Sequence, residues 1–136
     1  GCRFPGIMEF DRVLVDAPCS SMGSRKGTIS FSENRIRSLA RIQKSMLIRA
    51  FGLLKRGGTL VYSTCTKTVE ENENVIAHLL DKRSNAEMLP INLPFHAERG
   101  ECGDERVDLN VRRLELDEYF FVSKITKSGL ADENEV

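Results

Sequence analysis

The chain has 136 residues, 40% of them hydrophobic and 29% charged, which is the composition of one globular domain with its own core. Lysine and arginine together number 20, as do aspartate and glutamate, so the zero net charge neither favours nor excludes a nucleic-acid partner. No apolar run approaches the ~20 residues of a membrane span, and no signal peptide opens the chain. The start at Gly1, without a methionine, suggests a piece of a longer protein.

A buried strand is predicted over residues 10–15, because FDRVLV is short, apolar and rich in valine. Pro18 lacks the backbone N–H that a strand needs and marks the end of this element. Residues 20–29 are polar and contain glycine, which indicates a loop.

A long helix is predicted next, from a capping box of Ser30 and Glu33 to about Lys55. Gly57-Gly58 is expected to stop it, since glycine is common just past a helix. Apolar residues at helical spacing predict its buried face: Ile36, Leu39, Ala40, Leu47, Ala50, Phe51 and Leu54.

A second strand is predicted over residues 59–63, where the sequence reads TLVYS. Thr68 and Glu71 fit a second capping box, which predicts a helix that ends near Arg83. Glu70 and Glu71 also suit the positive end of that helix dipole.

The last part of the chain is less regular. A third strand is predicted over 87–91, and a short one near Val111 within the irregular segment 92–118. YFFVSKI predicts a clear strand over 119–125, and residues 127–136 are expected to form a disordered tail.

The order strand, helix, strand, helix, strand, strand predicts an α/β domain with a mostly parallel sheet. In such sheets ligands bind beyond the carboxyl ends of the strands. Asp16 and Cys19 follow the first strand, and Cys65 follows the second. If these strands are neighbours, both thiols and the carboxylate face one pocket.

Each of these residues also has a purely structural explanation. A free cysteine is among the most buried residue types, and Asp16 is placed to hydrogen-bond within a turn. Spacing alone leaves both explanations open. Neither the cysteines nor the two histidines, His78 and His96, show metal-ligand spacing, so no metal site is expected, and we interpret the cysteines as reduced thiols of a cytosolic protein.

Three segments together resemble a known family: FDRVLVDAPCS over 10–20, LLKRGGTLVYSTCT over 53–66 and EENE over 70–73. They resemble the Sun (Nol/Nop/Fmu) family of S-adenosylmethionine-dependent RNA cytosine-C5 methyltransferases. YFFV over 119–122 is similar, more weakly, to the family's closing strand. The resemblance implies the carboxyl-terminal half of a Rossmann-like methyltransferase sheet, mostly parallel with an antiparallel last strand.

The resemblance also implies a role for each motif residue. Cys65 matches the nucleophile that adds to cytosine C6, and Cys19 matches the second cysteine, which assists loss of the C5 proton or release of the adduct. Asp16 matches the acidic residue that contacts the cofactor and the target base. The implied cofactor is S-adenosylmethionine, and the implied partner is tRNA or rRNA, whose target base must leave its stack.

Some positions depart from the family pattern. Ser21 stands where the family often has glycine, and Arg56 where it often has proline. The family's glycine-rich cofactor loop would lie upstream of Gly1. We therefore expect residues 1–126 to be the carboxyl-terminal part of the catalytic domain, inactive without the amino-terminal half of the same domain.

Basic residues near the expected pocket are candidates for contacts with RNA phosphates. Arg25 and Lys26, in the loop after DAPCS, are the preferred RNA-binding residues. Arg37, Arg41 and Lys44 share one face of the predicted helix, where a solvated surface is the simpler explanation.

Two other functions stay open. A non-enzymatic module that binds RNA or a protein partner would fit the missing cofactor loop, although Cys19, Cys65 and Asp16 are all retained. A thiol hydrolase would need a histidine beside Cys65, and none is close to it in the sequence. The expected location is the cytoplasm, or the nucleolus if the organism is a eukaryote.

Overall fold

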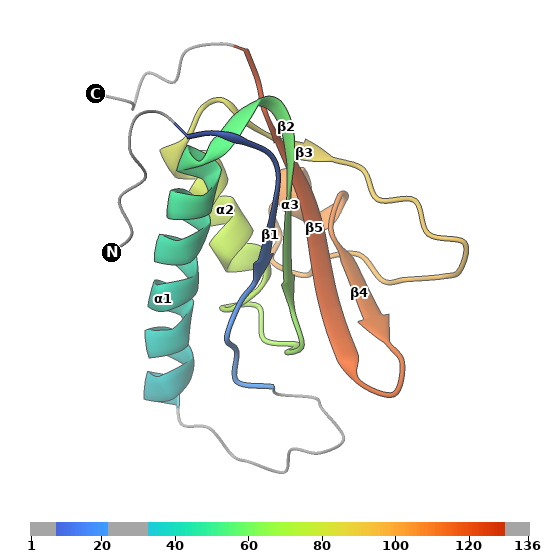
Figure 1. The fold of residues 1–136 in the computed structure, drawn as a ribbon. Coiled ribbons are helices and arrows are strands. Elements are labelled where there is room, and N and C mark those ends of the chain that lie inside the picture. Colours follow the sequence, from blue (N-terminus) through green and yellow to red (C-terminus); the bar gives the residue numbers. More distant parts are fainter. Residues whose placement is uncertain (1–7, 22–32, 130–136) are drawn as a thin grey trace.

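Five strands form one sheet in the computed structural model, which describes residues 8–21 and 33–129 (Figure 1). The elements in chain order are β1 (Phe10–Asp16), α1 (Glu33–Gly52), β2 (Leu54–Thr64), α2 (Glu73–Lys82), β3 (Ala86–Leu89), α3 (Glu105–Asp108), β4 (Arg112–Glu115) and β5 (Tyr119–Lys127). No helix in this part of the chain is long and apolar enough to cross a membrane.

The strands lie in the order β1-β2-β5-β3, and β4 also pairs with β5. β1 and β2 are parallel, whereas β5 is antiparallel to β2, β3 and β4. Four strands therefore run in one direction and β5 runs against them, which confirms the predicted α/β sheet with an antiparallel last strand. The order of elements did not predict that β5 would insert between β2 and β3, because sequential strands need not be neighbours.

The predicted boundary between the first helix and the second strand is wrong. α1 ends at Gly52 and β2 already begins at Leu54, so the glycine pair lies inside the strand. The pairing of β2 with β1 shifts register at this point. Gly57 has a φ of 79°, and a Cβ on Gly58 would lie 2.8 Å from the Asp11 carbonyl oxygen. The two glycines therefore permit a bulge and a close backbone approach, rather than a helix end.

The second helix begins later than its predicted capping box. Residues 69–72 form a turn, and α2 begins at Glu73. Thr68 does donate a hydrogen bond to the Glu71 carboxylate, but that carboxylate also accepts hydrogen bonds from Ser20, on the segment that follows β1. The capping box is therefore wrong, because a tertiary contact uses the glutamate that was assigned to the helix start.

The later strands lie close to their predicted positions. β3 begins one residue and ends two residues earlier than predicted, and β4 directly follows Val111. β5 extends to Lys127, and the N–H of Ser128 donates to the Asn85 carbonyl oxygen at 2.8 Å. The first residues of the expected tail thus belong to the sheet, whereas 130–136 lie outside the described residues.

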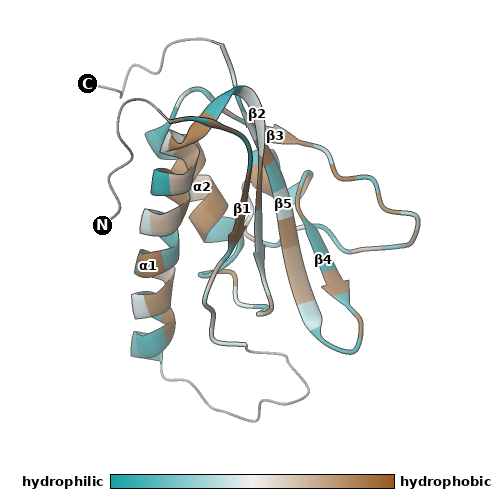
Figure 2. Cartoon of the chain, viewed as in Figure 1, coloured by the Kyte–Doolittle hydropathy of each residue, from teal (hydrophilic) through white to brown (hydrophobic). Residues whose placement is uncertain are grey.

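The hydrophobic core lies between α1, α2 and one face of the sheet (Figure 1). Phe121, Ser123 and Ile125 alternate along β5 with more exposed residues and are fully buried, as expected for a strand with one covered face. Leu47 and Phe51 of α1 are also fully buried in this core. Figure 2 shows the matching hydrophobic segments along β1, β5 and α2.

The other face of the sheet is open along β1 and β2. Leu14 is 69% exposed there, although it lies in the middle of a strand. A hollow of about 490 Å³ on this face is lined by Arg12, Leu14, Val61 and Lys124, among others. Val13, Leu14 and Val61 together give this hollow an apolar part of its lining.

Phe121→Ala is expected to lower the free energy of unfolding by about 3–5 kcal/mol, because it removes a fully buried ring and leaves a cavity. Phe120→Ala is the matched control: the neighbouring ring is 39% exposed, and its loss should cost less than about 1 kcal/mol. Urea unfolding followed by circular dichroism measures both variants. Equal losses would contradict the division into a covered and an open face.

Candidate active site

The two motif cysteines meet at the carboxyl ends of β1 and β2. The parallel pairing places Asp16 opposite Ser63, so the segments that follow these residues leave the sheet side by side. Cys19 and Cys65 are both partly buried, and their sulfur atoms lie 3.1 Å apart, within hydrogen-bonding distance. The prediction that the two thiols come together, made from residues 46 apart in the sequence, is confirmed.

Ser21 adds a hydroxyl group to the thiol pair. Its Oγ lies 3.5 Å from the sulfur of Cys65 and 3.9 Å from the sulfur of Cys19. Its φ is 57°, in the left-handed region that favours glycine. This backbone conformation gives a physical reason for the glycine that the family often has here, and shows that the serine fits at the expense of some strain.

Burial sets the protonation state of Cys19. Desolvation, followed by the side-chain hydrogen bond with Cys65, raises the pKa of the Cys19 thiol to about 11. Cys19 therefore stays protonated at neutral pH. A protonated Cys19 can donate its S–H toward the neighbouring sulfur of Cys65.

Asp16 lies at the end of β1 with an exposed side chain. Its backbone pairs with Ser63, and its carboxylate makes no hydrogen bond or ion pair with another of the described side chains. The structure thus places Asp16 at the same end of the sheet as the thiols, but does not join it to them. Arg25 and Lys26, the predicted RNA-binding residues, lie outside the described residues.

The helix face with the other basic residues borders a hollow. Arg37 and Arg41 are exposed and Lys44 is partly buried. Together with Glu70 and Asn74 they line a hollow of about 540 Å³ between α1 and α2. Most of the residues that line it are charged or polar, and a role of this face in RNA binding stays a prediction.

Glu71 is fully buried beside the thiols, and the sequence did not assign it to the site. One carboxylate oxygen accepts hydrogen bonds from the Ser20 N–H at 2.8 Å and from the Gln43 amide at 3.2 Å. The other accepts from the Ser20 hydroxyl at 2.6 Å and from the Thr68 hydroxyl. Gln43 also donates to the Pro18 carbonyl oxygen at 2.7 Å, so α1 helps to hold the DAPCS segment.

The segment that carries Cys65 is held by its own polar contacts. Thr64 donates to the Asn72 side chain, whose amide nitrogen donates to the Thr66 carbonyl oxygen at 2.7 Å. Thr64 and Thr66 flank the nucleophile candidate, and both are buried. The turn before α2 therefore fixes the backbone on each side of Cys65.

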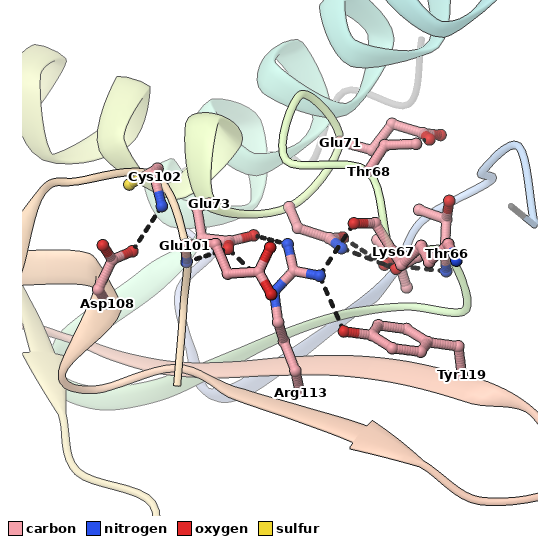
Figure 3. A network of polar contacts seen from close by, with 12 residues as sticks. Thr66, Lys67, Thr68, Glu71, Glu73, Glu101, Cys102, Asp108, Arg113 and Tyr119 are labelled. Atoms are coloured by element: carbon pink, nitrogen blue, oxygen red, sulfur yellow. Dashed lines mark hydrogen bonds and ion pairs between the residues drawn. The ribbon is translucent and has the colours of Figure 1, made fainter. Parts of the chain in front are cut away.

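A buried ion pair holds the same turn from the other side (Figure 3). Arg113 of β4 donates to both carboxylate oxygens of Glu73, at 3.0 and 2.6 Å. The same guanidinium donates to the Lys67 carbonyl oxygen at 2.9 Å and to the Tyr119 hydroxyl at 2.8 Å. Because Lys67 lies two residues after Cys65, the pair connects β4 to the end of the thiol segment.

The EENE segment contains both buried glutamates, Glu71 and Glu73, and is the part of the sequence that could have pointed to them. It follows STCT closely, but periodicity alone assigned its charges to the solvated start of a helix. Gln43 fitted the family's helix in the sequence comparison but was given no role, and Arg113 gave no signal, since each joins the network from a distant element.

The residues that the structure describes contain no group of three or more histidine, cysteine or acidic side chains that could hold a metal ion.

Solved structures place the fold among the methyltransferases. A methyltransferase homologue from Pyrococcus horikoshii superposes with a TM-score of 0.75 at 36% identity, over 88% of this chain and 40% of that one. The NSun6 protein from Pyrococcus horikoshii, crystallised with SFG, gives a TM-score of 0.74 at 30% identity, over 88% of this chain and 30% of that one.

Residues 3–126 match the family described as 16S rRNA methyltransferase RsmB/F, and the chain belongs to this family of S-adenosylmethionine methyltransferases. Its relatives include the tRNA (cytosine(49)-C(5))-methyltransferase of Pyrococcus abyssi, 37% identical over 87% of this chain and 42% of the relative. The ribosomal RNA small subunit methyltransferase F of Vibrio cholerae is 40% identical over 93% of this chain and 28% of the relative. The chain thus spans less than half the length of these relatives, and the resemblance to the Sun family is confirmed.

Iodoacetamide should modify Cys19 slowly at neutral pH, with a rate that rises until the pH nears 11, because only the thiolate reacts. Short reaction pulses over a pH series, followed by peptide mass spectrometry, measure this rate. Glutathione in the same mixture is the control, since a solvated thiol levels off near its ordinary pKa. A Cys19 rate that levels off together with that of glutathione would contradict the buried, protonated thiol.

Proposed function

We propose that this chain is the part of an RNA methyltransferase that bears the catalytic thiols, and that the enzyme transfers a methyl group from S-adenosylmethionine to C5 of a cytosine in tRNA or rRNA. The observation that carries the proposal is the contact between Cys19 and Cys65, 3.1 Å apart at two adjacent strand ends in a chain of this family. Relatives named as cytosine-C5 methyltransferases of tRNA and rRNA support the choice of reaction.

Cys65 is the nucleophile in this mechanism. Cytosine C5 reacts poorly with an electrophile until the Cys65 thiolate adds to C6 and makes C5 an enamine-like carbon. S-adenosylmethionine, when bound, supplies an electrophilic methyl group. Once C5 carries that group, a base such as a water molecule takes up the C5 proton, and the electron pair of that C–H bond restores the C5–C6 double bond and expels the Cys65 sulfur from C6, so the Cys65 thiolate is regenerated.

Cys19 and Asp16 assist the nucleophile. Cys19, protonated at neutral pH and 3.1 Å from the Cys65 sulfur, assists release of the adduct in this proposal by donating to the departing sulfur; to assist loss of the C5 proton it would first have to give up its own proton. Asp16 contacts the cofactor and the target base in this proposal. The target base reaches these groups only after it has left its stack.

The residues present fit the cofactor in part. Asp16 offers an exposed carboxylate without a side-chain partner among the described residues, at the carboxyl end of a parallel strand, which is where such sheets bind ligands. S-adenosylmethionine carries an ammonium group and hydroxyls that a carboxylate accepts. SFG, a cofactor analogue, was present in one of the similar structures. Arg25 and Lys26 contact RNA phosphates in this proposal.

The chain alone is inactive in this proposal, and residues 1–126 belong to the carboxyl-terminal part of the catalytic domain, whose last strand continues to Lys127. Three features support it: β1 forms an edge of the sheet, Leu14 of the same strand is 69% exposed, and the chain spans 42% or less of the two relatives compared above. An incomplete sheet offers only part of a cofactor pocket.

In the longer protein that contains this chain, Cys65→Ala should abolish transfer of a labelled methyl group to RNA, because the thiolate that activates cytosine is gone. Cys19→Ala should instead leave a covalent protein–RNA adduct, which denaturing gel electrophoresis detects. Cys102→Ala is the control and should keep its activity, since no motif contains this residue. Full transfer by Cys65→Ala would exclude it as the nucleophile, and no transfer by any form would favour the non-enzymatic module.

The chain by itself should bind S-adenosylmethionine weakly or not at all, because it lacks the family's glycine-rich loop. Isothermal titration calorimetry of the chain, with the longer protein as the positive control, measures this. Equal affinity of the two proteins would mean that the described residues already form the complete pocket.

A further inference from the structure

We propose that Glu71 is the positioning residue of the thiol pair: its buried carboxylate fixes the segment that carries Cys19 against the segment that carries Cys65. The inference deepens the proposed function and rests on it for its biological meaning. The contacts themselves involve no RNA and no cofactor, so the positioning role can be tested separately.

The carboxylate of Glu71 is fully buried and fully hydrogen-bonded. Its four donors are the N–H and the hydroxyl of Ser20, the amide of Gln43 and the hydroxyl of Thr68. Each oxygen accepts two of these bonds. The two oxygens of a carboxyl group offer enough acceptor sites for all four of these donors, which explains why a glutamate stands here.

All four partners are neutral, which separates Glu71 from its neighbour Glu73. Glu73 pairs with the Arg113 guanidinium, whereas no ion pair to Glu71 occurs among the described residues. A pair of opposite charges explains how Glu73 ties α2 to β4. Glu71 acts differently, because the directions of its four hydrogen bonds fix the position of Ser20.

Ser20 transmits this position to the thiols. It lies between Cys19 and Ser21, and both of these neighbours contact the Cys65 sulfur, at 3.1 and 3.5 Å. The Ser20 hydroxyl also lies 3.0 Å from the hydroxyl of Thr66, the residue after Cys65. Three consecutive residues after β1 thus contact two consecutive residues after β2, with the Glu71 carboxylate behind them.

Removal of this carboxylate would leave the buried Ser20 N–H without its acceptor, while the Gln43 amide would keep its hydrogen bond to the Pro18 carbonyl oxygen. Buried donors in that state move toward water or another acceptor, so the DAPCS segment would shift and the two sulfur atoms would separate. A displacement of about 1 Å is enough to change the rate of a reaction between positioned groups by as much as ~100-fold.

The test measures how readily Cys19 and Cys65 react with each other. Cys2→Ser and Cys102→Ser leave these two as the only thiols. Oxidised glutathione first forms a mixed disulfide with one protein thiol and releases one reduced glutathione. The second protein thiol then displaces the other glutathione, so a sulfur–sulfur bond forms while oxidised glutathione takes up two electrons and two protons. Mass spectrometry follows both steps.

In this background, Glu71→Ala should slow ring closure at least ~10-fold relative to formation of the mixed disulfide. Glu71→Gln keeps one acceptor oxygen for the Ser20 N–H and should lie between Glu71→Ala and the parent. Glu70→Ala is the matched control, because Glu70 is the adjacent acidic residue and is exposed. The ratio of the two steps reports the distance between the thiols, which a general loss of stability does not change while the protein is folded.

Thermal melting shows whether each variant is folded at the assay temperature. If Glu71→Ala is unfolded at that temperature, Ser20→Ala is tested in its place. This substitution removes only the hydroxyl that contacts both Glu71 and Thr66, and it should slow ring closure at least about threefold. The result is taken from whichever of these two variants is folded. If its ring closes as fast as in Glu70→Ala, the positioning role of Glu71 is overturned. That result leaves the proposed function intact, whereas full methyl transfer by Cys65→Ala overturns the proposed function and leaves the thiol geometry intact.

Discussion

The parallel pairing of β1 with β2 is the constraint on which the site depends. Parallel neighbours end at the same edge of a sheet, so two segments far apart in the chain leave it side by side. The pairing continues past Asp16, where the Ala17 N–H donates to the Ser63 carbonyl oxygen at 3.2 Å. Cys19 and Cys65 are then close because of backbone geometry, before any side-chain contact is made. The side-chain contacts around the two cysteines then adjust a sulfur–sulfur distance that the strand pairing has already made short.

Two buried glutamates two residues apart refine this geometry from opposite sides. Glu71 accepts hydrogen bonds from the segment after β1, and Glu73 binds Arg113 of β4. Each must be desolvated, and a buried carboxylate is costly unless its partners are complete. The Tyr62 hydroxyl donates to the Glu71 carbonyl oxygen at 2.7 Å, and burial together with the Glu71 charge raises the pKa of Tyr62, so this donor keeps its proton. The short turn before α2 is therefore held on several sides.

The sequence predicted the parts of this structure that depend on local patterns, and missed those that depend on tertiary contacts. Strand ends after FDRVLV and TLVYS could be read from apolar runs, and parallel pairing then predicted the meeting of Cys19 and Cys65. Gly57 looked like a helix stop because the same residue type serves helix ends and bulges. Glu71 looked like a helix cap because its partner Ser20 lies 51 residues away, and no local pattern reports such a contact.

Ser21 shows how the local backbone and the thiols constrain each other. A left-handed conformation costs a residue with a Cβ roughly 1 kcal/mol more than glycine. The structure places this residue, with a φ of 57°, so that its hydroxyl lies 3.5 Å from the Cys65 sulfur. A glycine at position 21 would relax the turn. Among the hydrogen bonds described, the Cys65 sulfur would then keep only its contact with Cys19. Because Glu71 holds the preceding residue, Ser20, through two hydrogen bonds, a relaxed turn would also move Cys19, and the strain is therefore retained beside Cys65.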